Sequence, residues 1–321
     1  MKEEVLDWLL QSEHYVEYNA RIEFLKSQKM EKETKRSKLR MLEDQRIKTI
    51  LNELTQWPGY PLKRHNDATH LLHKLSFIAD IGIRKDDLDS SKIINSILKN
   101  RSPEGIFEII TNVPTHFGGS GKDEYAWMLC DAPTILYSLQ KLGVDNNEVN
   151  TALKYLVNLK KENGWHCSAS PKLGKFRGPG KKGDPCPYAN LITLKALIQQ
   201  TKWKKDKVCK EGAEVLLGLW DQRKERKPYL FAMGTDFKKL KAPMIWYDII
   251  HFTDVISQIP AFHKDERFLE MISILKAKED INGFYTAESV WRAAKEWDFG
   301  QKKEPSPWIT LLIYRILERI K

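Results

Sequence analysis

The stretch that decides the fold is Asp131-Ala132-Pro133-Thr134-Ile135-Leu136, a polar start followed at once by apolar residues. Four other segments begin in a similar way. They are Asp67-Ala68-Thr69-His70-Leu71-Leu72, Tyr188-Ala189-Asn190-Leu191-Ile192, Tyr247-Asp248-Ile249-Ile250-His251 and Trp308-Ile309-Thr310-Leu311-Leu312. From Ala68 through Ala132, Tyr188 and Tyr247 to Trp308 the steps are 64, 56, 59 and 61 residues. This period exceeds the roughly 34 to 47 residues of common helical solenoids and suits a helical hairpin with a long loop.

A second kind of helical pattern precedes each of these segments. It has one apolar stripe with spacings of three and four, and it recurs at residues 47–54, 93–98, 153–157, 208–219 and 268–275. The segments after the loops are apolar on nearly all sides, and helices of that kind are buried. We therefore expect striped outer helices around buried inner helices. With an N-terminal helix pair they make about six hairpins, closed into an all-α fold of the α/α toroid type.

The predicted organisation is a toroid repeat domain at residues 43–321, with N-terminal helices and a basic linker at residues 1–42 packing on the ring. Apolar residues make up 41% of the 321-residue chain, which is ample for a core. No apolar run approaches the ~18 residues of a membrane span, and the acidic start lacks the apolar core of a signal peptide. Four cysteines do not make a disulfide framework in a chain of this length. We expect a soluble, cytoplasmic protein.

The net charge of +10 is concentrated in two runs, residues 29–40 and residues 172–182. Basic patches bind phosphate, nucleic acid or membrane surfaces. A solvated helix face accounts equally well for the first run, and a solvated loop for the second. Lys175 and Arg177 lie among the glycines of the second run, where they would grip a diphosphate.

Two turns between outer and inner helices carry a family resemblance. Asn163-Gly164-Trp165 and Asn282-Gly283-Phe284 resemble the Gly-Trp and Gly-Phe turns of the prenyltransferase and squalene-cyclase repeat superfamily. The resemblance covers roughly residues 43–321. It implies a toroid whose lumen takes an isoprenoid or another hydrophobic substrate. The chain departs from the family in lacking both the Asp-x-Asp-Asp motif of cyclases and the Asp-Asp-x-x-Asp magnesium motif.

Cysteine and histidine side chains mark a candidate zinc site. Cys167 follows the turn of the third hairpin, and Cys186 precedes the inner helix of the same hairpin after a glycine-rich loop. We expect the two sulfurs to meet, with His166 or His251 as further ligands, because zinc prefers Cys and His in tetrahedral geometry. Two free thiols, or a loop-closing pair without metal, are the alternatives.

Polar and aromatic residues at the starts of the inner helices would line the mouth and lumen of the ring. Carboxylates and histidines that face one cavity act as acids or bases. The catalytic candidates are His65, Asp67, His70, Asp131, Asp248 and His251. The substrate-binding candidates are Tyr188, Trp246, Tyr247, Trp308, Lys175 and Arg177. Helix capping by the Asp residues, Asp131 above all, is the alternative.

The first predicted function is an enzyme that acts on a prenyl or polycyclic substrate, for example a prenyl diphosphate, as a cyclase or transferase with zinc as its cofactor. The second is a non-catalytic toroid that binds a hydrophobic ligand or a partner. The third is a helical repeat that binds nucleic acid through its basic surfaces, which requires exposed aromatic residues among the positive charge.

Overall fold

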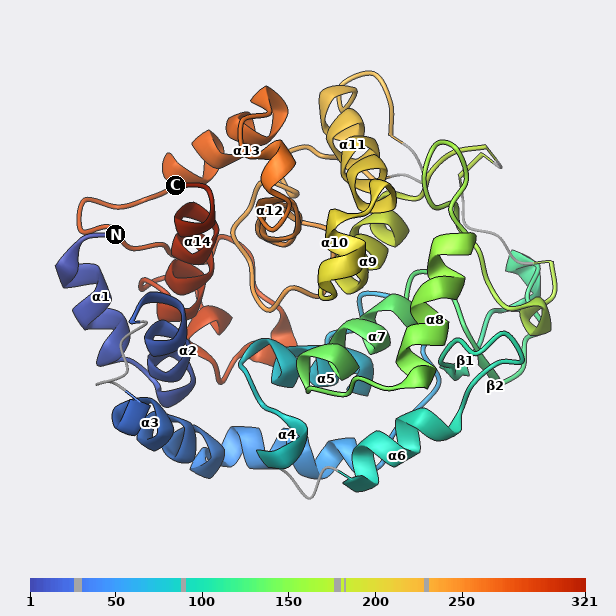
Figure 1. Cartoon of the computed structure of the whole chain (residues 1–321), viewed down its shortest axis with the longest axis horizontal. Helices are drawn as coiled ribbons and strands as arrows, with labels where there is room; N and C mark the ends of the chain where they lie inside the picture. Colours follow the sequence, from blue (N-terminus) through green and yellow to red (C-terminus); the bar gives the residue numbers. More distant parts are fainter. Residues whose placement is uncertain (26–30, 88–90, 176–179, 182, 228–230) are drawn as a thin grey trace. The chain divides into compact units, whose positions relative to one another are not determined.

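The structure is a computed structural model that describes residues 1–25, 31–87, 91–175, 180–181, 183–227 and 231–321 (Figure 1). These residues form fourteen α-helices and one two-stranded sheet. The mainly helical fold expected from the sequence is therefore confirmed. The contacts divide the chain into two compact units, residues 1–52 with 235–321 and residues 53–234, which are called unit 1 and unit 2 below.

Unit 2 contains the first three inner helices. Its α-helices are α5 (Leu71–Asp80), α6 (Ser91–Lys99), α7 (Ala132–Lys141), α8 (Asn147–Asn158), α9 (Pro187–Leu197), α10 (Thr201–Lys205) and α11 (Lys207–Asp221). Its short 3-10 helices are η2 (Lys85–Asp87), η3 (Thr115–Phe117) and η4 (Pro171–Leu173). Helix α7 contacts both α5 and α9, and α9 also contacts α11. Every residue of α9 is buried, whereas α8 buries one stripe of four residues, as the two kinds of pattern predicted.

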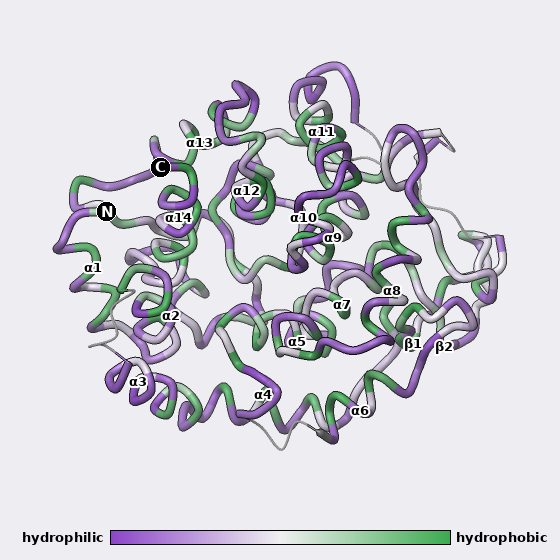
Figure 2. Tube along the Cα trace, viewed as in Figure 1, coloured by the Kyte–Doolittle hydropathy of each residue, from purple (hydrophilic) through white to green (hydrophobic). Residues whose placement is uncertain are grey.

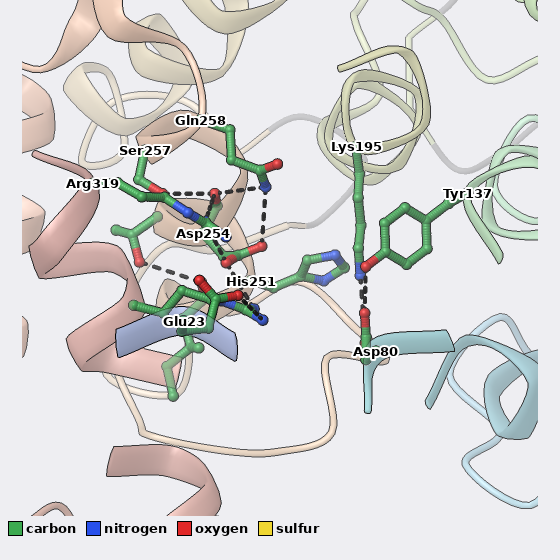
Figure 3. Close-up of polar contacts among 12 residues, drawn as sticks. Glu23, Asp80, Tyr137, Lys195, His251, Asp254, Ser257, Gln258 and Arg319 are labelled. Atoms are coloured by element: carbon green, nitrogen blue, oxygen red, sulfur yellow. Dashed lines mark hydrogen bonds and ion pairs between the residues drawn. The ribbon is translucent and has the colours of Figure 1, made fainter. Parts of the chain in front are cut away.

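A polar contact joins the three inner helices of unit 2. The Tyr137 hydroxyl of α7 donates a hydrogen bond to the Asp80 carboxylate at the end of α5 (Figure 3). The Lys195 ammonium of α9 lies 3.9 Å from the other Asp80 oxygen and 4.2 Å from the centre of the Tyr137 ring. All three side chains are buried. Since buried charges are costly unless they are paired, this cluster fixes the alignment of α5, α7 and α9.

The small sheet of unit 2 was not predicted. Strand β1 (Ile109–Thr111) pairs antiparallel with β2 (Glu124–Ala126), and Ile109 lies opposite Ala126. The glycine-rich stretch at residues 117–121 is part of the connection between these strands. The strands are only three residues long, too short for the alternation of apolar and polar residues to stand out in the sequence.

Unit 1 combines both ends of the chain. Its helices are α1 (Glu3–Leu10), α2 (His14–Phe24), α3 (Glu31–Glu43), α12 (Ile249–Ser257), α13 (Glu266–Lys276) and α14 (Pro307–Arg319), and α4 (Gln45–Leu54) crosses into unit 2. Its 3-10 helices are η6 (Pro260–Phe262), η7 (Arg292–Ala294) and η8 (Asp298–Gly300). The first basic run forms most of α3, which is mainly hydrophilic and buries only Ser37 and Met41 (Figure 2). The solvated-face interpretation fits this helix.

The inner helices of unit 1 are joined by a buried ion-pair network. The Asp254 carboxylate of α12 accepts hydrogen bonds from Arg315 and Arg319 of α14, each at 2.9 Å (Figure 3). Gln258, one turn further along α12, donates to the same carboxylate at 3.3 Å. Asp254 and Arg315 are both buried, so this network holds α12 against α14.

All ten outer and inner helices predicted from the two patterns are present. The closure of the hairpins into a ring, and the division of the chain at residue 42, stay predictions. None of the helices in the described parts of the chain has both the length and the apolar character needed to cross a bilayer.

Candidate metal centre

A short antiparallel contact in unit 2 brings two cysteine-bearing segments side by side. Met128 forms an antiparallel bridge with Ala169, flanked by hydrogen bonds from the Leu129 amide to Ser168 and from the Ser170 amide to Trp127. After Met128 the chain enters a turn, in which the Asp131 amide donates to the Met128 carbonyl at 2.9 Å. Cys130 lies in this turn, and Cys167 lies two residues before Ala169 on the paired segment.

A second bridge brings Cys186 beside the same segment. His166 pairs with Pro185, and the Cys186 amide donates to the Trp165 carbonyl at 2.8 Å. The Asn190 side chain secures this arrangement, because it donates to the carbonyls of both Trp165 and Cys186 at 2.7 Å. Trp165 itself is fully buried, as the structural interpretation of its turn predicted.

Cys130, Cys167 and Cys186 lie near one another. The neighbouring thiols of Cys167 and Cys186, together with burial, raise the pKa of Cys130 well above its ordinary value. Cys130 and Cys186 are buried, whereas Cys167 is partly exposed. That Cys167 and Cys186 lie close enough to share a ligand stays a prediction, which their common influence on the pKa of Cys130 supports.

His65 and Asp131 form a pair at the edge of the thiol cluster. The His65 Nδ1 atom lies 2.9 and 3.2 Å from the two Asp131 oxygens. Burial lowers the pKa of His65, but the adjacent Asp131 carboxylate outweighs burial, and the charges of Cys167 and Cys186 act in the same direction, so that the pKa is raised. The two cysteines therefore lie within electrostatic range of the ring. With Nδ1 bound to Asp131, the Nε2 atom has no hydrogen-bond partner among the described residues.

Asp131 is the exception among the residues that precede the inner helices. His70, Cys186, Asp248 and Ser306 occupy the N-cap position of α5, α9, α12 and α14, and the side chain of each accepts a backbone N–H of its own helix. Asp131 occupies the same position of α7, but its side chain makes no capping bond. The capping alternative is therefore wrong for Asp131, whose carboxylate binds His65 instead.

Two of the thiols stand at helix starts. Cys186 is the N-cap of α9, where its sulfur lies 3.5 Å from the Ala189 amide. Cys130 immediately precedes the N-cap of α7.

The other histidines near this cluster are bound to backbone groups. His70 accepts from the Leu72 amide through Nδ1, and its Nε2 lies 2.9 Å from the Tyr60 carbonyl. His73 Nε2 lies 2.7 Å from the carbonyl of His65. Because each Nε2 must donate to its carbonyl, both rings hold the loop before α5 in place.

Asp67 forms a local network in the same loop. Its carboxylate accepts hydrogen bonds from the Tyr60 hydroxyl at 2.7 Å and from the amide and hydroxyl of Thr69. Burial raises the pKa of Asp67, but the hydrogen bonds from Thr69 and Tyr60 outweigh it and lower the pKa. Asp67 therefore shapes the turn that precedes His70.

The predicted zinc ligands are only partly brought together. His166 turns to the opposite side of its extended segment from Cys167, and its Nε2 lies 2.6 Å from the Asn163 side-chain oxygen. His251 belongs to unit 1. As the side chains lie, the described residues contain no group of three or more His, Cys, Asp or Glu with the arrangement of a metal site.

The candidate residues of unit 1 are placed as follows. The Asp248 carboxylate accepts the His251 amide at 3.0 Å, and the His251 Nδ1 atom lies 2.7 Å from the Trp246 carbonyl. The Tyr247 ring packs against Phe237, with 5.0 Å between their centres. The buried Trp308 ring lies 5.4 Å from that of Tyr15.

The remaining candidates lie in unit 2. Tyr188, in the first turn of α9, is buried within electrostatic range of Asp131 and Cys130. Lys175 is exposed. Arg177 lies outside the described residues. In the same basic run, Lys172 is paired with the buried Glu108 at 2.9 Å, so its charge is neutralised locally.

Sequence reasoning missed Cys130 and did not pair His65 with Asp131. A signal for Cys130 was available, because it stands beside Asp131 at the start of an inner helix. The missing step was the bridge between Met128 and Ala169, which brings the segments that carry Cys130 and Cys167 side by side. No family model, curated protein or solved structure matches this chain.

Proposed function

We propose that unit 2 binds one zinc ion through Cys130, Cys167, Cys186 and His65, with Asp131 orienting the histidine. The observation that carries the proposal is the His65–Asp131 pair, at 2.9 Å, beside three cysteines from separate loops: Cys167 and Cys186 act on the pKa of both His65 and Cys130. Three sulfurs and one imidazole nitrogen make a Cys₃His set, a common tetrahedral set for structural zinc. This set replaces the His166 and His251 ligands that the sequence suggested.

The chemistry of the thiols is compatible with this proposal. Protonated thiols approach each other along S–H···S contacts, whereas zinc requires deprotonated sulfurs about 2.3 Å from the metal. Binding therefore releases the thiol protons and turns the sulfurs from each other towards the ion. Rotation of the cysteine side chains about χ1 would provide this movement.

The role proposed for Asp131 follows from its bond to His65. A carboxylate on one ring nitrogen sets the tautomer and directs the other nitrogen towards the metal. With Nδ1–H bound to Asp131, Nε2 is the donor atom available to zinc. Loss of such a carboxylate costs about 10- to 100-fold in metal affinity.

Metal content and cobalt spectra test the proposal. The purified full chain should hold one zinc per molecule, and cobalt should give a thiolate-to-cobalt charge-transfer band. Single replacement of Cys130, Cys167 or Cys186 by serine should abolish tight binding. Asp131→Asn should keep the stoichiometry and weaken binding by about 10- to 100-fold.

Matched variants separate this site from the one suggested by the sequence. Cys209→Ala, His166→Ala and His251→Ala should retain zinc with unchanged affinity, because none of these residues belongs to the proposed set. If His166→Ala or His251→Ala lost zinc while Cys130→Ser kept it, the proposed ligand set would be wrong. The set suggested by the sequence, with His166 or His251 as a ligand, would then be favoured.

A prenyl or polycyclic substrate, or a non-catalytic hydrophobic ligand, stays a prediction. A surface pocket of unit 2 of about 490 Å³ is lined by Val157, Lys160, Lys161, Glu162 and Glu211, and its charged lining is poorly suited to an isoprenoid. Titration of the zinc-loaded protein with prenyl diphosphates tests the prediction directly. Nucleic-acid binding has no observation in its favour.

A further inference from the structure

We propose that unit 1 binds the carboxylate group of a small organic acid between the ammonium group of Lys241 and the indole N–H of Trp291. The observation behind it is a buried ammonium that has neither an ion pair nor a hydrogen bond to any described residue. Both residues belong to unit 1, whereas the proposed zinc ligands belong to unit 2. The carboxylate site therefore stands or fails independently of the metal.

Lys241 is the exception among the buried Asp, Glu, Lys and Arg side chains that the structure describes. Only 7% of its surface is exposed. The others each have a hydrogen-bond or ion-pair partner, and they are Glu17, Asp80, Glu108, Asp131, Lys195, Asp248, Asp254 and Arg315. Because a buried charge is costly unless it is paired, an anion that pairs with Lys241 stabilises the folded chain.

The Trp291 ring accounts for only part of the Lys241 environment. The ammonium nitrogen lies over this ring, 4.6 Å from its centre, where the ring face attracts the cation. An ammonium carries three donors and no acceptor, so one ring face leaves donors unsatisfied. The Trp291 Nε1 atom is itself buried and has no hydrogen-bond partner among the described residues. Two donor groups and one positive charge thus meet without an acceptor.

Glu288, the carboxylate nearest to Trp291 along the chain, is used elsewhere. Its Oε2 atom accepts the Leu240 amide at 2.9 Å and lies 2.5 Å from the Lys278 ammonium. The Leu240 carbonyl in turn accepts the Glu288 amide at 2.9 Å. These bonds tie the segment that carries Lys241 to the segment that carries Trp291, so the two donors are held together by the backbone.

The charge and the number of donors favour a carboxylate over a phosphate. One ammonium balances one negative charge, and the indole N–H supplies a donor for a second oxygen. A phosphate group carries about two charges and three acceptor oxygens, more than this pair satisfies. Because so little of Lys241 is exposed, the acid has to be small.

NMR of the full chain with nitrogen-15-labelled tryptophan tests the proposal, with sodium acetate and sodium butyrate as probes. The indole N–H resonance of Trp291, assigned by its loss in Trp291→Phe, should shift saturably as either probe is added. In calorimetric titrations, Lys241→Met should weaken binding by about tenfold or more, the loss expected for a hydrogen bond to a charged group. Trp291→Phe keeps an aromatic face and the buried charge but removes the N–H, and it should also weaken binding.

Lys202 and Trp203 of unit 2 provide a matched control. The Lys202 ammonium lies 5.2 Å from the centre of the Trp203 ring, and the Trp203 Nε1 atom is likewise buried without a hydrogen-bond partner in the described structure. Lys202 differs in being exposed and bonded to Asn150. The Trp203 resonance should therefore not respond to acetate, and Lys202→Met should leave the affinity unchanged.

Three results would overturn the inference. The first is a Trp291 resonance that stays in place in about 0.1 M acetate, where salt already screens exposed charges. The second is an equal shift with sodium chloride, or in Lys241→Met, which would show an effect of ions in general. The third is tighter binding of inorganic phosphate than of acetate, which would refute the carboxylate assignment.

Discussion

At the scale of single residues, the surroundings decide what each cysteine does. Cys130, Cys167 and Cys186 share one contact region, whereas Cys209 lies alone within α11 and is fully buried. Burial, and to a lesser degree the charge of Asp206, raise the pKa of Cys209 to about 12. Since the thiolate is the reactive form, Cys209 should be inert.

This contrast gives the first prediction, measured with a chromogenic disulfide reagent on zinc-free protein at pH 8. The native wild type and Cys209→Ala should react at the same rate and to the same extent. In guanidinium, the variant should show one reactive thiol fewer than the four of the wild type. If the native wild type showed a fast phase of thiol reaction that Cys209→Ala lacked, the predicted inertness of Cys209 would be wrong.

Glu17 of unit 1 shows how partners reverse an effect of burial. Its carboxylate accepts hydrogen bonds from Arg40 at 2.8 Å and from Arg21 at 3.0 Å. Burial raises the pKa of Glu17, but the hydrogen bonds and charges of Arg40 and Arg21 outweigh it, so the pKa lies below its usual 4.5. The ionised carboxylate therefore stabilises the folded state.

The second prediction is that Glu17→Gln lowers the free energy of unfolding by about 1.5–3 kcal/mol at pH 7, the range for hydrogen bonds to charged groups. A carboxyl with a depressed folded-state pKa contributes fully above its unfolded pKa and loses this contribution as the pH falls below about 4.5. Urea titrations from pH 7 to pH 3 should show the variant and the wild type converging. A difference that grows towards low pH would reverse the assigned sign.

At the scale of elements, a turn with the same hydrogen bonds precedes an inner helix in both units. In unit 2, Asn190 of α9 binds the Trp165 amide, and Cys186 donates to the Trp165 carbonyl. In unit 1, Thr310 of α14 binds the Tyr285 amide, and Ser306 donates to the Tyr285 carbonyl in the same way. The equivalent of Trp165 is thus Tyr285, whereas Phe284 is half-buried and stacks on Trp8.

Gly164 occupies the position in this turn of unit 2 where any side chain would clash. Its φ is +104°, and a Cβ atom would lie 2.5 Å from the Asn190 side-chain oxygen that accepts the Trp165 amide. The third prediction is that Gly164→Ala lowers the free energy of unfolding by about 2–4 kcal/mol, combining backbone strain with a displaced hydrogen bond. Chemical denaturation checks the size of the loss.

Two further glycines provide matched controls. Gly143 also has a positive φ, of +87°, but a Cβ atom there would meet nothing within 4 Å, so Gly143→Ala should cost only the strain, about 1–2 kcal/mol. Gly218 lies inside α11 with open space around it, so Gly218→Ala should stabilise by about 0.5–1 kcal/mol. If Gly164→Ala costs no more than Gly143→Ala, the steric role of Asn190 is refuted.

The helices were predictable because their signal is local. Striped and fully apolar patterns placed α8 and α9, for instance, to within a few residues. The placing of Cys130 near Cys167 depends on long-range pairing, such as the bridge between Met128 and Ala169, which no local period encodes. Asp residues at helix starts tend to cap the helix, and Asp248 does cap α12. Asp131 does not cap α7, because its carboxylate binds His65 instead.

At the scale of the whole molecule, the proposed ligands all belong to unit 2 although they come from four separate segments. Zinc would cross-link the loops before α5, α7 and α9 and the turn at Cys167. A ligand that binds only the folded state stabilises it by about 2.7 kcal/mol at 100 times its dissociation constant. The stabilisation should first suppress local opening of the segments that carry the ligands.

Hydrogen–deuterium exchange of the full chain, with and without zinc, gives the last prediction. Residues 62–73, 127–136, 164–170 and 184–190 should exchange more slowly in zinc, by up to about 100-fold where exchange requires opening of the site. Helices α2 and α12 of unit 1 should be unchanged, because their own polar networks lie outside the proposed site. Cys186→Ser should lose the zinc effect, and His251→Ala should keep it. Protection that appears around His251 in unit 1, with none at residues 127–136, would place the metal elsewhere in the chain.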